Sequence, residues 1–220
     1  MKKHKIFIAI DTNKIKAAKK IINLTNTNKL KIGYKFGLEF INSKNGRSFI
    51  SKIKNKVTFL DLKLNDIPNT CASTVKAIRD LNVNYLTIHI SSGIEALKEV
   101  KKVSGKIKIV GVTTLTSLDN KNLKEVGYNK SVKNLIIHQS KLAQKAKLDA
   151  IVCSPNEVNY VGKFFKKEII TPGVRFNKNK QDQKRTMHPS KIKSDWLVCG
   201  RILTKGNFKN NLKKLIQYLN

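Results

Sequence analysis

Cysteine is scarce in this sequence of 220 residues, which contains only Cys71, Cys153 and Cys199. No two of them form a CxxC pair, and an odd number of cysteines cannot close into a complete set of disulfides. Cys153 and Cys199 lie within apolar runs, where a free cysteine behaves as a small hydrophobic residue. These features argue against a disulfide-stabilised scaffold and suit a reducing cytosol, so we expect a cytoplasmic protein.

Long hydrophobic runs are also lacking. No stretch approaches the roughly 18 consecutive apolar residues that indicate a membrane-spanning helix. The beginning of the chain, MKKHKIFIAID, is basic and then apolar, but Asp11 interrupts the apolar run too early for the core of a signal peptide. We therefore expect a soluble intracellular protein that has no membrane partner.

Acidic residues are few, with 14 against 45 lysines and arginines, and the formal net charge is +31. Such a charge ordinarily suggests nucleic acid or an anionic membrane as a partner. Very few of the basic residues are arginine, however, and arginine is the residue preferred for bidentate contacts with phosphates and bases. The lysines are scattered among many asparagines and isoleucines, whose codons are also A/T-rich. We attribute the charge to base composition and expect no nucleic-acid partner.

Short β-rich runs alternate with amphipathic stretches along the whole chain. The strand-like runs are 5–10, 29–33, 57–62, 85–90, 107–112, 150–154, 168–173 and 196–200, and the helical patterns include 70–81, 94–103, 131–146 and 206–219. Repeated βα units predict a parallel sheet, and eight such units close into a (β/α)8 TIM barrel. An open doubly wound sheet is the runner-up, but no GxGxxG follows the first strand. No low-complexity linker divides the chain, so we expect residues 1–220 to form a single domain.

Residues able to bind polar groups gather at the carboxyl ends of these strands, which form the catalytic face of a barrel. They are Asp11, Lys31, Asp61, Lys63, His89, Thr116, Ser117, Arg175, Gly200 and Arg201. Alternation along the third strand places Asp61 and Lys63 on one face and the neighbouring leucines on the other, and Asp66 follows in the loop. Such clusters are typical of sites where pKa values are tuned, although an internal salt bridge that caps the barrel would use the same residues.

The segment 61–70, DLKLNDIPNT, resembles the signature of the orotidine 5′-monophosphate decarboxylase family. Further segments are similar to other motifs of that family in the same order, namely FIAID (7–11), KIG (31–33), VTTLTS (112–117), TPGVR (171–175), DQKR (182–185) and CGR (199–201). Two features depart from the family pattern. Ile202 stands where a proline usually follows the Gly-Arg pair, and the loop from Arg175 to Gln183 is slightly short.

The resemblance implies an enzyme that converts orotidine 5′-monophosphate to uridine 5′-monophosphate, the last step of pyrimidine nucleotide synthesis, without cofactor or metal ion. Preorganised charge would then carry the catalysis. Lys63 would donate the proton from between Asp61 and Asp66, and Lys31 would hold Asp61 and a ribose hydroxyl. The implied substrate-binding residues are Asp11, Lys31, Ile67, Thr70, Thr116, Ser117, Arg175, Gln183, Gly200 and Arg201.

The resemblance also implies a homodimer in which Asp66 reaches the neighbouring subunit's site. Two alternatives remain open at this point. One is a Mg²⁺-dependent sugar-phosphate decarboxylase or aldolase of the same superfamily, which takes an acidic metal ligand from the second strand, where this chain has Lys31. The other is a basic nucleic-acid-binding protein on a barrel that has lost catalysis. We interpret His89 as a structural residue in each case.

Overall fold

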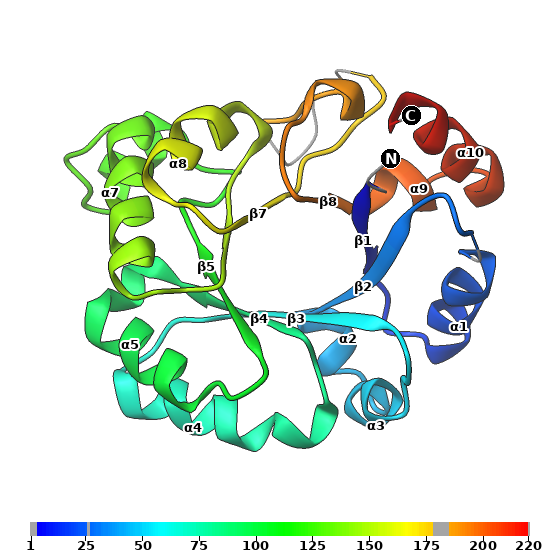
Figure 1. Ribbon diagram of the computed structural model, residues 1–220, viewed down its shortest axis with the longest axis horizontal. Coiled ribbons are helices and arrows are strands. Elements are labelled where there is room, and N and C mark those ends of the chain that lie inside the picture. The colour runs from blue at the N-terminus through cyan, green and yellow to red at the C-terminus, as the bar shows by residue number, and fades with distance from the viewer. Residues whose placement is uncertain (1–3, 26, 178–184, 220) are drawn as a thin grey trace.

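The computed structural model describes residues 4–25, 27–177 and 185–219. Within them, parallel strands are hydrogen-bonded in sequence order, and β1 also pairs with β8, which closes a barrel. Figure 1 shows the strands around the centre of the molecule with the helices outside them. The strands are β1 Lys5–Ile10, β2 Lys31–Gly37, β3 Val57–Leu64, β4 Tyr85–His89, β5 Lys108–Val112, β6 Ala150–Val152, β7 Glu168–Thr171 and β8 Trp196–Cys199. The predicted (β/α)8 TIM barrel is confirmed.

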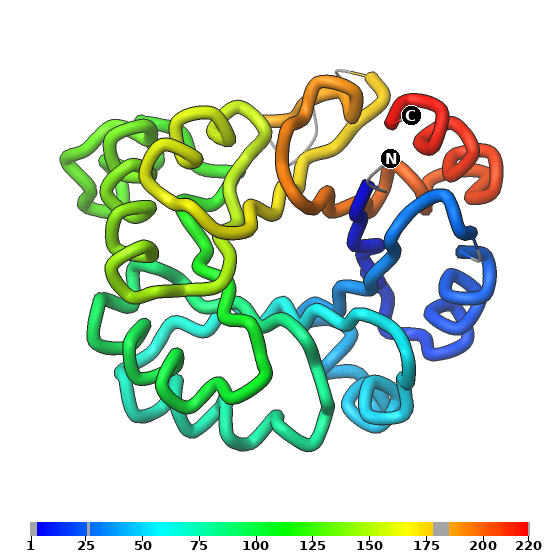
Figure 2. Tube along the Cα trace, in the orientation of Figure 1, coloured from blue at the N-terminus to red at the C-terminus, as the bar shows by residue number. Residues whose placement is uncertain are grey.

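Helices follow the strands and cover the outside of the barrel. They are α1 Ile15–Leu24, α2 Leu38–Ile41, α3 Gly46–Ser51, α4 Pro68–Ala77, α5 Gly93–Val103, α6 Asn120–Glu125, α7 Val132–Lys145, α8 Val158–Phe164, α9 Arg201–Thr204 and α10 Phe208–Leu219. Short 3-10 helices are η1 Arg79–Leu81, η2 Ile90–Ser92, η3 Pro155–Glu157 and η4 Pro189–Lys191. Local signals set several boundaries: Pro68 occupies the first turn of α4, and the Ser131 hydroxyl accepts the Asn134 N–H at the start of α7. The tube in Figure 2 shows the chain passing once around the barrel, which the pairing of β1 with β8 closes.

Successive side chains of a strand point to opposite faces, and in this barrel both faces of the strands are buried. The inner face fills the barrel with Phe7, Phe59, Tyr85, Trp196 and smaller apolar residues. Phe7 stacks on Trp196 with 4.1 Å between the ring centroids. The outer face packs residues such as Leu60 under the helices. Burial of each large apolar side chain contributes roughly 1.5–3 kcal/mol, so these two layers supply much of the driving force for folding.

Polar groups close the amino-terminal end of the barrel. The Tyr85 hydroxyl donates to Glu168 at 2.8 Å, and the same carboxylate lies 3.3 Å from Lys5 Nζ and 3.0 Å from Lys108 Nζ. Burial, together with the neighbouring Glu168 carboxylate, raises the pKa of Tyr85 to about 12. These groups satisfy one another, which distinguishes this end from the carboxyl end, where a cavity lies.

Strand β2 is longer than the sequence pattern predicts. The expected strand ended at Gly33, whereas β2 continues to Gly37. Gly33 lies inside the strand because the Phe7 ring fills the barrel beside it: a Cβ at this position would lie 2.6 Å from Cε1 of that ring. The glycine therefore permits a close approach and does not end the strand. As a result, Lys35 also belongs to β2, near its carboxyl end.

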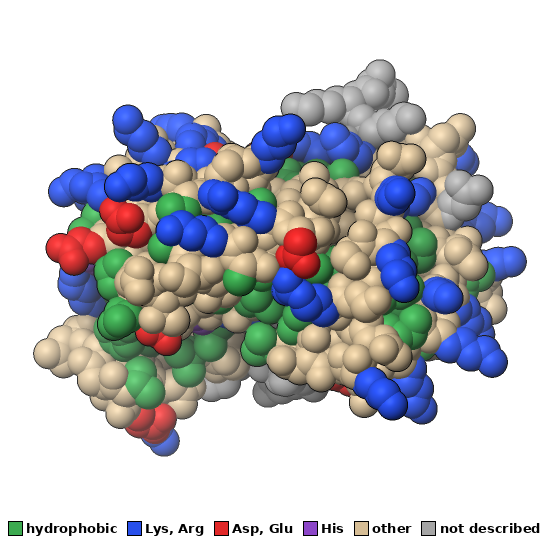
Figure 3. Space-filling model, turned by 90° about the horizontal axis from the view of Figure 1, so that it is seen from below, with side chains coloured by type: hydrophobic (Ala, Val, Ile, Leu, Met, Phe, Trp, Pro, Cys, Tyr) green, Lys and Arg blue, Asp and Glu red, His purple; other side chains and the backbone are tan. Residues whose placement is uncertain are grey.

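The surface of the described part of the chain carries the excess positive charge. On the face drawn in Figure 3, lysine and arginine side chains outnumber acidic ones and are spread over most of the surface. Cys71, Cys153 and Cys199 are buried and have free thiols. Among the described residues, no helix combines the length and apolar character that crossing a bilayer would require.

Candidate active site

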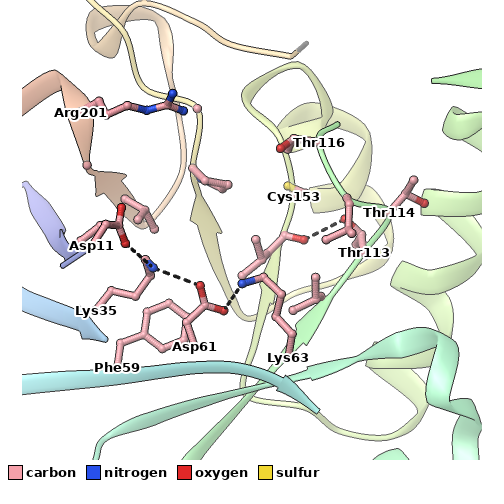
Figure 4. A pocket seen from close by; sticks show the side chains of 18 of the residues that line it. Asp11, Lys35, Phe59, Asp61, Lys63, Thr113, Thr114, Thr116, Cys153 and Arg201 are labelled. Carbon is pink, nitrogen blue, oxygen red and sulfur yellow. Dashed lines mark hydrogen bonds and ion pairs between the residues drawn. The ribbon is translucent and has the colours of Figure 1, made fainter. Parts of the chain in front are cut away.

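A cavity of about 250 Å³ lies at the carboxyl ends of the strands. Its walls come from distant parts of the sequence: β1, β2 and β3 supply one side, and the loops after β5, β7 and β8 supply much of the rest. Asp11, Lys35, Asp61 and Lys63 form its charged part, while Arg201 enters from the start of α9. Figure 4 shows this arrangement, with Arg201 set apart from the four other charged groups.

Asp61 lies in the middle of a row of alternating charges, which we call the charged row and which consists of Asp11, Lys35, Asp61 and Lys63 (Figure 4). Lys35 Nζ is 3.6 Å from Asp11 Oδ1 and 3.2 Å from Asp61 Oδ2. Lys63 Nζ is 2.9 Å from the other oxygen of Asp61. The side chains of Lys35 and Asp61 are both 12% exposed, whereas that of Lys63 is 36% exposed. Lys63 is therefore the more accessible of the two cations to a ligand in the cavity.

The charged row keeps its two buried members ionised. Burial alone would raise the pKa of Asp61, but the positive charges of Lys35 and Lys63 outweigh it and hold that pKa below its usual value. Burial alone would lower the pKa of Lys35, but the carboxylates of Asp61 and Asp11 outweigh it and raise that pKa. Asp61 and Lys35 therefore both carry their charges at neutral pH.

The backbone of Lys63 adopts an unusual conformation. Its φ of 52° lies in the left-handed region, which residues other than glycine rarely adopt. Backbone strain of this kind costs of order 1–3 kcal/mol and persists where the surroundings enforce it. Here the Thr87 hydroxyl on β4 accepts the Lys63 N–H at 2.7 Å. The direction in which the Lys63 side chain leaves β3 is therefore determined partly by a neighbouring strand.

Lys31 does not belong to the charged row, and its assignment to this network was wrong. It pairs with Lys5, the first residue of β1, so it lies at the amino-terminal end of the barrel, opposite Asp61. Lys35 lies further along β2 on the same face and takes the position that was assigned to Lys31. The error followed from ending the strand at Gly33.

The loop after β5 brings hydroxyl groups to the cavity. Thr113, Thr114 and Thr116 line it. Gln139, a buried residue of α7, accepts the Thr114 N–H at 3.0 Å and so fixes the start of this loop. Ser117, which the sequence grouped with Thr116, is exposed one residue further along. The loop can therefore offer hydrogen bonds to a ligand from the side of the cavity away from Asp11 (Figure 4).

The ends of β7 and β8 supply the arginines and a glycine. Arg175 and Arg201 line the cavity, and Arg175 Nη1 donates to the Val174 carbonyl at 2.8 Å. Gly200 allows a close approach, since a Cβ there would lie 3.3 Å from Asp11 Oδ2. Gln183, the other residue expected on this side, lies outside the described residues. The two arginines give this end of the cavity a positive charge that suits an anionic group.

Arg185 connects three loops at the rim of the barrel. Its Nη2 donates to the carbonyls of Thr114 and Leu115 at 3.0 and 2.8 Å. Its Nε lies 3.2 Å from Oε1 of Glu157, whose side chain is only 2% exposed. The other oxygen of Glu157 accepts the Ser154 N–H at 2.8 Å. The chain that returns from the loop after β7 is therefore anchored to the loops after β5 and β6.

Three residues of the motif after β3 do not line this cavity in the single chain. Asp66, Ile67 and Thr70 are exposed, and Ile67 has 66% of its surface accessible. Asp66 Oδ1 accepts the N–H of Ile67 at 2.7 Å, which fixes the loop at the start of α4. Within one chain, therefore, these residues are not brought together with Lys63.

Sequence reasoning missed Lys35, Thr87, and the Arg185–Glu157 pair. A signal for Lys35 was present, because period-2 alternation from Lys31 through position 33 continues to position 35. No comparable signal marks Thr87 or Glu157, since their partners lie on other strands and loops. Among the described residues there is also no group of three or more His, Cys, Asp or Glu side chains placed to hold a metal ion.

Comparison with known proteins agrees with this geometry. The family model described as "Orotidine 5′-phosphate decarboxylase / HUMPS family" matches residues 4–215. An orotidine 5′-phosphate decarboxylase of Wolbachia sp. subsp. Brugia malayi (strain TRS) is 44% identical over 96% of both chains. The orotidine 5′-phosphate decarboxylase structure from Lactobacillus acidophilus has a TM-score of 0.84 at 24% identity, covering 99% of both chains. The corresponding enzyme from Methanocaldococcus jannaschii, solved with the inhibitor BMP, has a TM-score of 0.79 at 23% identity over the full length of both. The chain therefore belongs to the orotidine 5′-phosphate decarboxylase / HUMPS family.

Proposed function

We propose that this protein is an orotidine 5′-monophosphate decarboxylase, which forms uridine 5′-monophosphate in pyrimidine biosynthesis. The observation that carries the proposal is the charged row, in which Asp61 lies between Lys35 and the accessible ammonium of Lys63. The relatives of high coverage bear the same name, and the family match spans nearly the whole chain. A cavity that combines this row with two arginines suits a substrate carrying a carboxylate and a phosphate.

Lys63 is the proton donor in the proposed mechanism. The bond between C6 of the pyrimidine and its carboxylate breaks, CO₂ departs, and the bonding electron pair stays on C6. The Lys63 ammonium stabilises this developing carbanion and then transfers a proton to C6, which completes the product. The electron pair left on C6 becomes the new C6–H bond, and Lys63 regains a proton from solvent before the next turnover. We propose that fixed charge carries this step and that neither cofactor nor metal ion takes part.

Asp61 and Lys35 determine the electrostatic environment of the Lys63 ammonium. The Asp61 carboxylate lies 2.9 Å from Lys63 Nζ. In the proposed complex the substrate carboxylate binds next to Asp61, so repulsion between the two carboxylates is relieved as CO₂ leaves. Lys35 neutralises Asp61 from the other side, at 3.2 Å, and we assign to it the ribose contact that the family resemblance implied for Lys31. Asp11, whose side chain is 61% exposed, binds the ribose as well.

The nucleotide's two polar ends bind at the other walls of the cavity. Arg201 and the Gly200 backbone hold the phosphate at the end of β8, with Arg175 and Gln183 contributing from the loop after β7. The supporting observation is that both arginines line the cavity, with Arg201 set apart from the charged row (Figure 4). Thr116, assisted by Ser117, binds the polar edge of the pyrimidine. Binding energy from the phosphate then positions the ring over Lys63.

We also propose a homodimer whose two active sites are each completed by the partner. The supporting observation is that Asp66, Ile67 and Thr70 are exposed. Ile67 is thus a large apolar side chain that is accessible to solvent, next to the Asp66 carboxylate. Burial of Ile67 in an interface would remove apolar surface from water. Asp66 would then place a second carboxylate beside the partner's Lys63. We further propose that the chain acts as a single domain in the cytoplasm.

The alternatives are less well supported. In a Mg²⁺-dependent sugar-phosphate enzyme of this superfamily, the second strand would supply an acidic ligand, whereas here it supplies Lys35, whose ammonium lies between Asp11 and Asp61. A nucleic-acid-binding protein would require binding that weakens steeply with salt. The relatives that match over most of the chain are named as decarboxylases of the nucleotide.

An absorbance assay with orotidine 5′-monophosphate tests the proposed function. The purified protein should convert the substrate to uridine 5′-monophosphate with release of one CO₂ per turnover, and EDTA should not change the rate. Lys63→Ala serves as the matched inactive variant and excludes a contaminating enzyme. A folded wild-type protein that produces no uridine 5′-monophosphate, or whose turnover stops with EDTA and returns with Mg²⁺, would contradict the proposal.

A further inference from the structure

The ladder between β3 and β4 is interrupted beside the charged row. Leu60 pairs with Leu86, and the next pair joins Leu64 to Ile88. Over this interval β3 advances four residues while β4 advances two, so β3 departs from a regular ladder and forms a bulge. A bulge leaves backbone groups without their ladder partners, and buried backbone groups need partners of some kind. Asp61 and Lys63 lie within the bulged interval.

Thr87 supplies the missing contact. It lies on β4 opposite the bulge, and its side chain is fully buried. Its hydroxyl accepts the Lys63 N–H at 2.7 Å and donates its own proton to Asp61 Oδ1 at 3.1 Å. A hydroxyl carries one proton and two lone pairs, so it can make both hydrogen bonds at once.

The two hydrogen bonds act on both ends of the ion pair between Asp61 and Lys63. The Asp61 oxygen that accepts from Thr87 is the same Oδ1 that lies 2.9 Å from Lys63 Nζ. The N–H that donates to Thr87 belongs to the residue whose backbone adopts a φ of 52°. One hydroxyl therefore fixes the point from which the Lys63 side chain leaves the strand and also the oxygen that its ammonium contacts.

We propose that Thr87 is a positioning residue for the decarboxylation, an inference that rests on the proposed function. Its hydroxyl holds the left-handed backbone of Lys63 and orients Asp61, so that the ammonium points to the position of C6. Because Thr87 is fully buried, it touches neither the substrate nor the reacting atoms and acts only through its two neighbours. Loss of the Thr87 hydroxyl should therefore slow the chemical step more than it weakens nucleotide binding.

Substitutions at Thr87 separate the hydroxyl from the side-chain volume. Thr87→Val has nearly the same shape but loses both hydrogen bonds, and we expect its kcat to fall by about 10- to 100-fold, since a misplacement of about 1 Å can cost about 100-fold. KM and the Kd for uridine 5′-monophosphate should stay near their wild-type values, because Arg201 and Thr116 bind the nucleotide from other loops. Thr87→Ser keeps the hydroxyl and should recover most of the lost kcat.

Thr171→Val is the matched control. Thr171 is also fully buried on a barrel strand, but its hydroxyl has no hydrogen-bond partner among the described residues. The same loss of a hydroxyl there should leave kcat unchanged. Should Thr87→Val fail to fold, Thr87→Ala and Thr87→Ser form a second pair, which lose the same methyl group and differ only in the hydroxyl. We expect serine to exceed alanine by at least about 10-fold in kcat.

Three results would overturn the inference: Thr87→Val with wild-type kcat, serine no better than alanine, or a loss that appears in nucleotide binding and leaves kcat intact. Each of them requires an active wild-type enzyme. If the wild-type protein does not turn over orotidine 5′-monophosphate, it is the proposed function that fails, so the two failures are distinguishable. The amide exchange rate of Lys63, which should rise in Thr87→Val but not in Thr171→Val, checks the hydrogen bond without any assay of activity.

Discussion

Lys35 Nζ lies 3.2 Å from Asp61 Oδ2, and this ion pair crosses from β2 to β3 inside the barrel. Both side chains are only 12% exposed, so each charge would be costly to bury without the other. Asp11 adds a second carboxylate at 3.6 Å from the same ammonium. The Lys35–Asp61 ion pair therefore links β2 to β3. It also helps to keep the Asp61 carboxylate ionised beside Lys63.

Lys35→Met should destabilise the fold by about 3–5 kcal/mol, because it leaves the Asp61 carboxylate buried beside one cation in place of two. Lys31→Met is the matched control, since it removes the same charge from the same strand but at an exposed position. Its effect should stay within about 0.5 kcal/mol. Unfolding in urea at neutral pH measures both. Equal effects of the two substitutions would contradict the assignment of the network lysine to Lys35.

Lys63→Ala and Asp66→Ala should each be nearly inactive as homodimers, because each active site needs Lys63 of one chain and Asp66 of the other. In a heterodimer of the two variants, one site carries both defects and the other is complete. Unfolding and refolding an equal mixture should restore about a quarter of wild-type activity if the chains pair at random through one isologous interface.

Subunit exchange must be demonstrated in that mixture, for example by mass spectrometry of chains that differ in a tag. A mixture that exchanges subunits and stays inactive would mean that Asp66 acts within its own chain. A protein that remains monomeric at assay concentrations while fully active would lead to the same conclusion.

Arg201→Ala should weaken binding of uridine 5′-monophosphate but barely affect uridine. A charge-assisted hydrogen bond is worth roughly 1.5–3 kcal/mol, which corresponds to about a 10- to 150-fold loss of affinity. Lys205→Ala, which removes a neighbouring exposed positive charge that does not line the cavity, controls for a general loss of charge. Calorimetric titration with both ligands is the measurement. Equal losses for nucleotide and nucleoside would show that Arg201 does not contact the phosphate.

His89 should titrate below its usual range. Burial lowers the pKa of His89 and the Lys63 cation lowers it further, with partial compensation from the Asp61 carboxylate. Lys63→Met removes that cation, so it should move the pKa upward. Titration of the imidazole C–H signals by NMR measures this, and the spectrum of His89→Gln identifies the His89 signal. A His89 pKa that does not change in Lys63→Met would contradict the predicted coupling.

The same shift predicts a pH dependence of stability. Because the folded state binds the His89 proton less tightly than the unfolded chain does, the folded state loses stability as pH falls below about 6.5, the usual histidine value. The free energy of unfolding of the wild type should therefore decrease between neutral and mildly acidic pH, and His89→Gln should show a shallower decrease. A steeper decrease in His89→Gln would mean that the sign of the shift is wrong.

Much of the architecture could be predicted from consecutive residues. The alternation of β-rich runs with helical patterns is a local property, and it led to the closed barrel that the structure contains. Alternation within β3 likewise predicts that Asp61 and Lys63 share a face, since successive side chains on a strand point to opposite sides. Both residues line the cavity. The motif after β3 also places Asp66 beyond the strand end without reference to any other part of the chain.

The tertiary structure alone decided which lysine joins Asp61 and how Lys63 is held. Lys35, and not Lys31, contacts Asp61 because β2 continues beyond Gly33. Gly33 is required by the Phe7 ring on the neighbouring strand, and no local sequence pattern contains that contact between strands. Thr87 contacts Asp61 and Lys63 only because β3 bulges against β4. Periodicity specifies the face on which a side chain lies. Register between strands depends on the packing of side chains that are distant in the sequence, and it determines which charges meet.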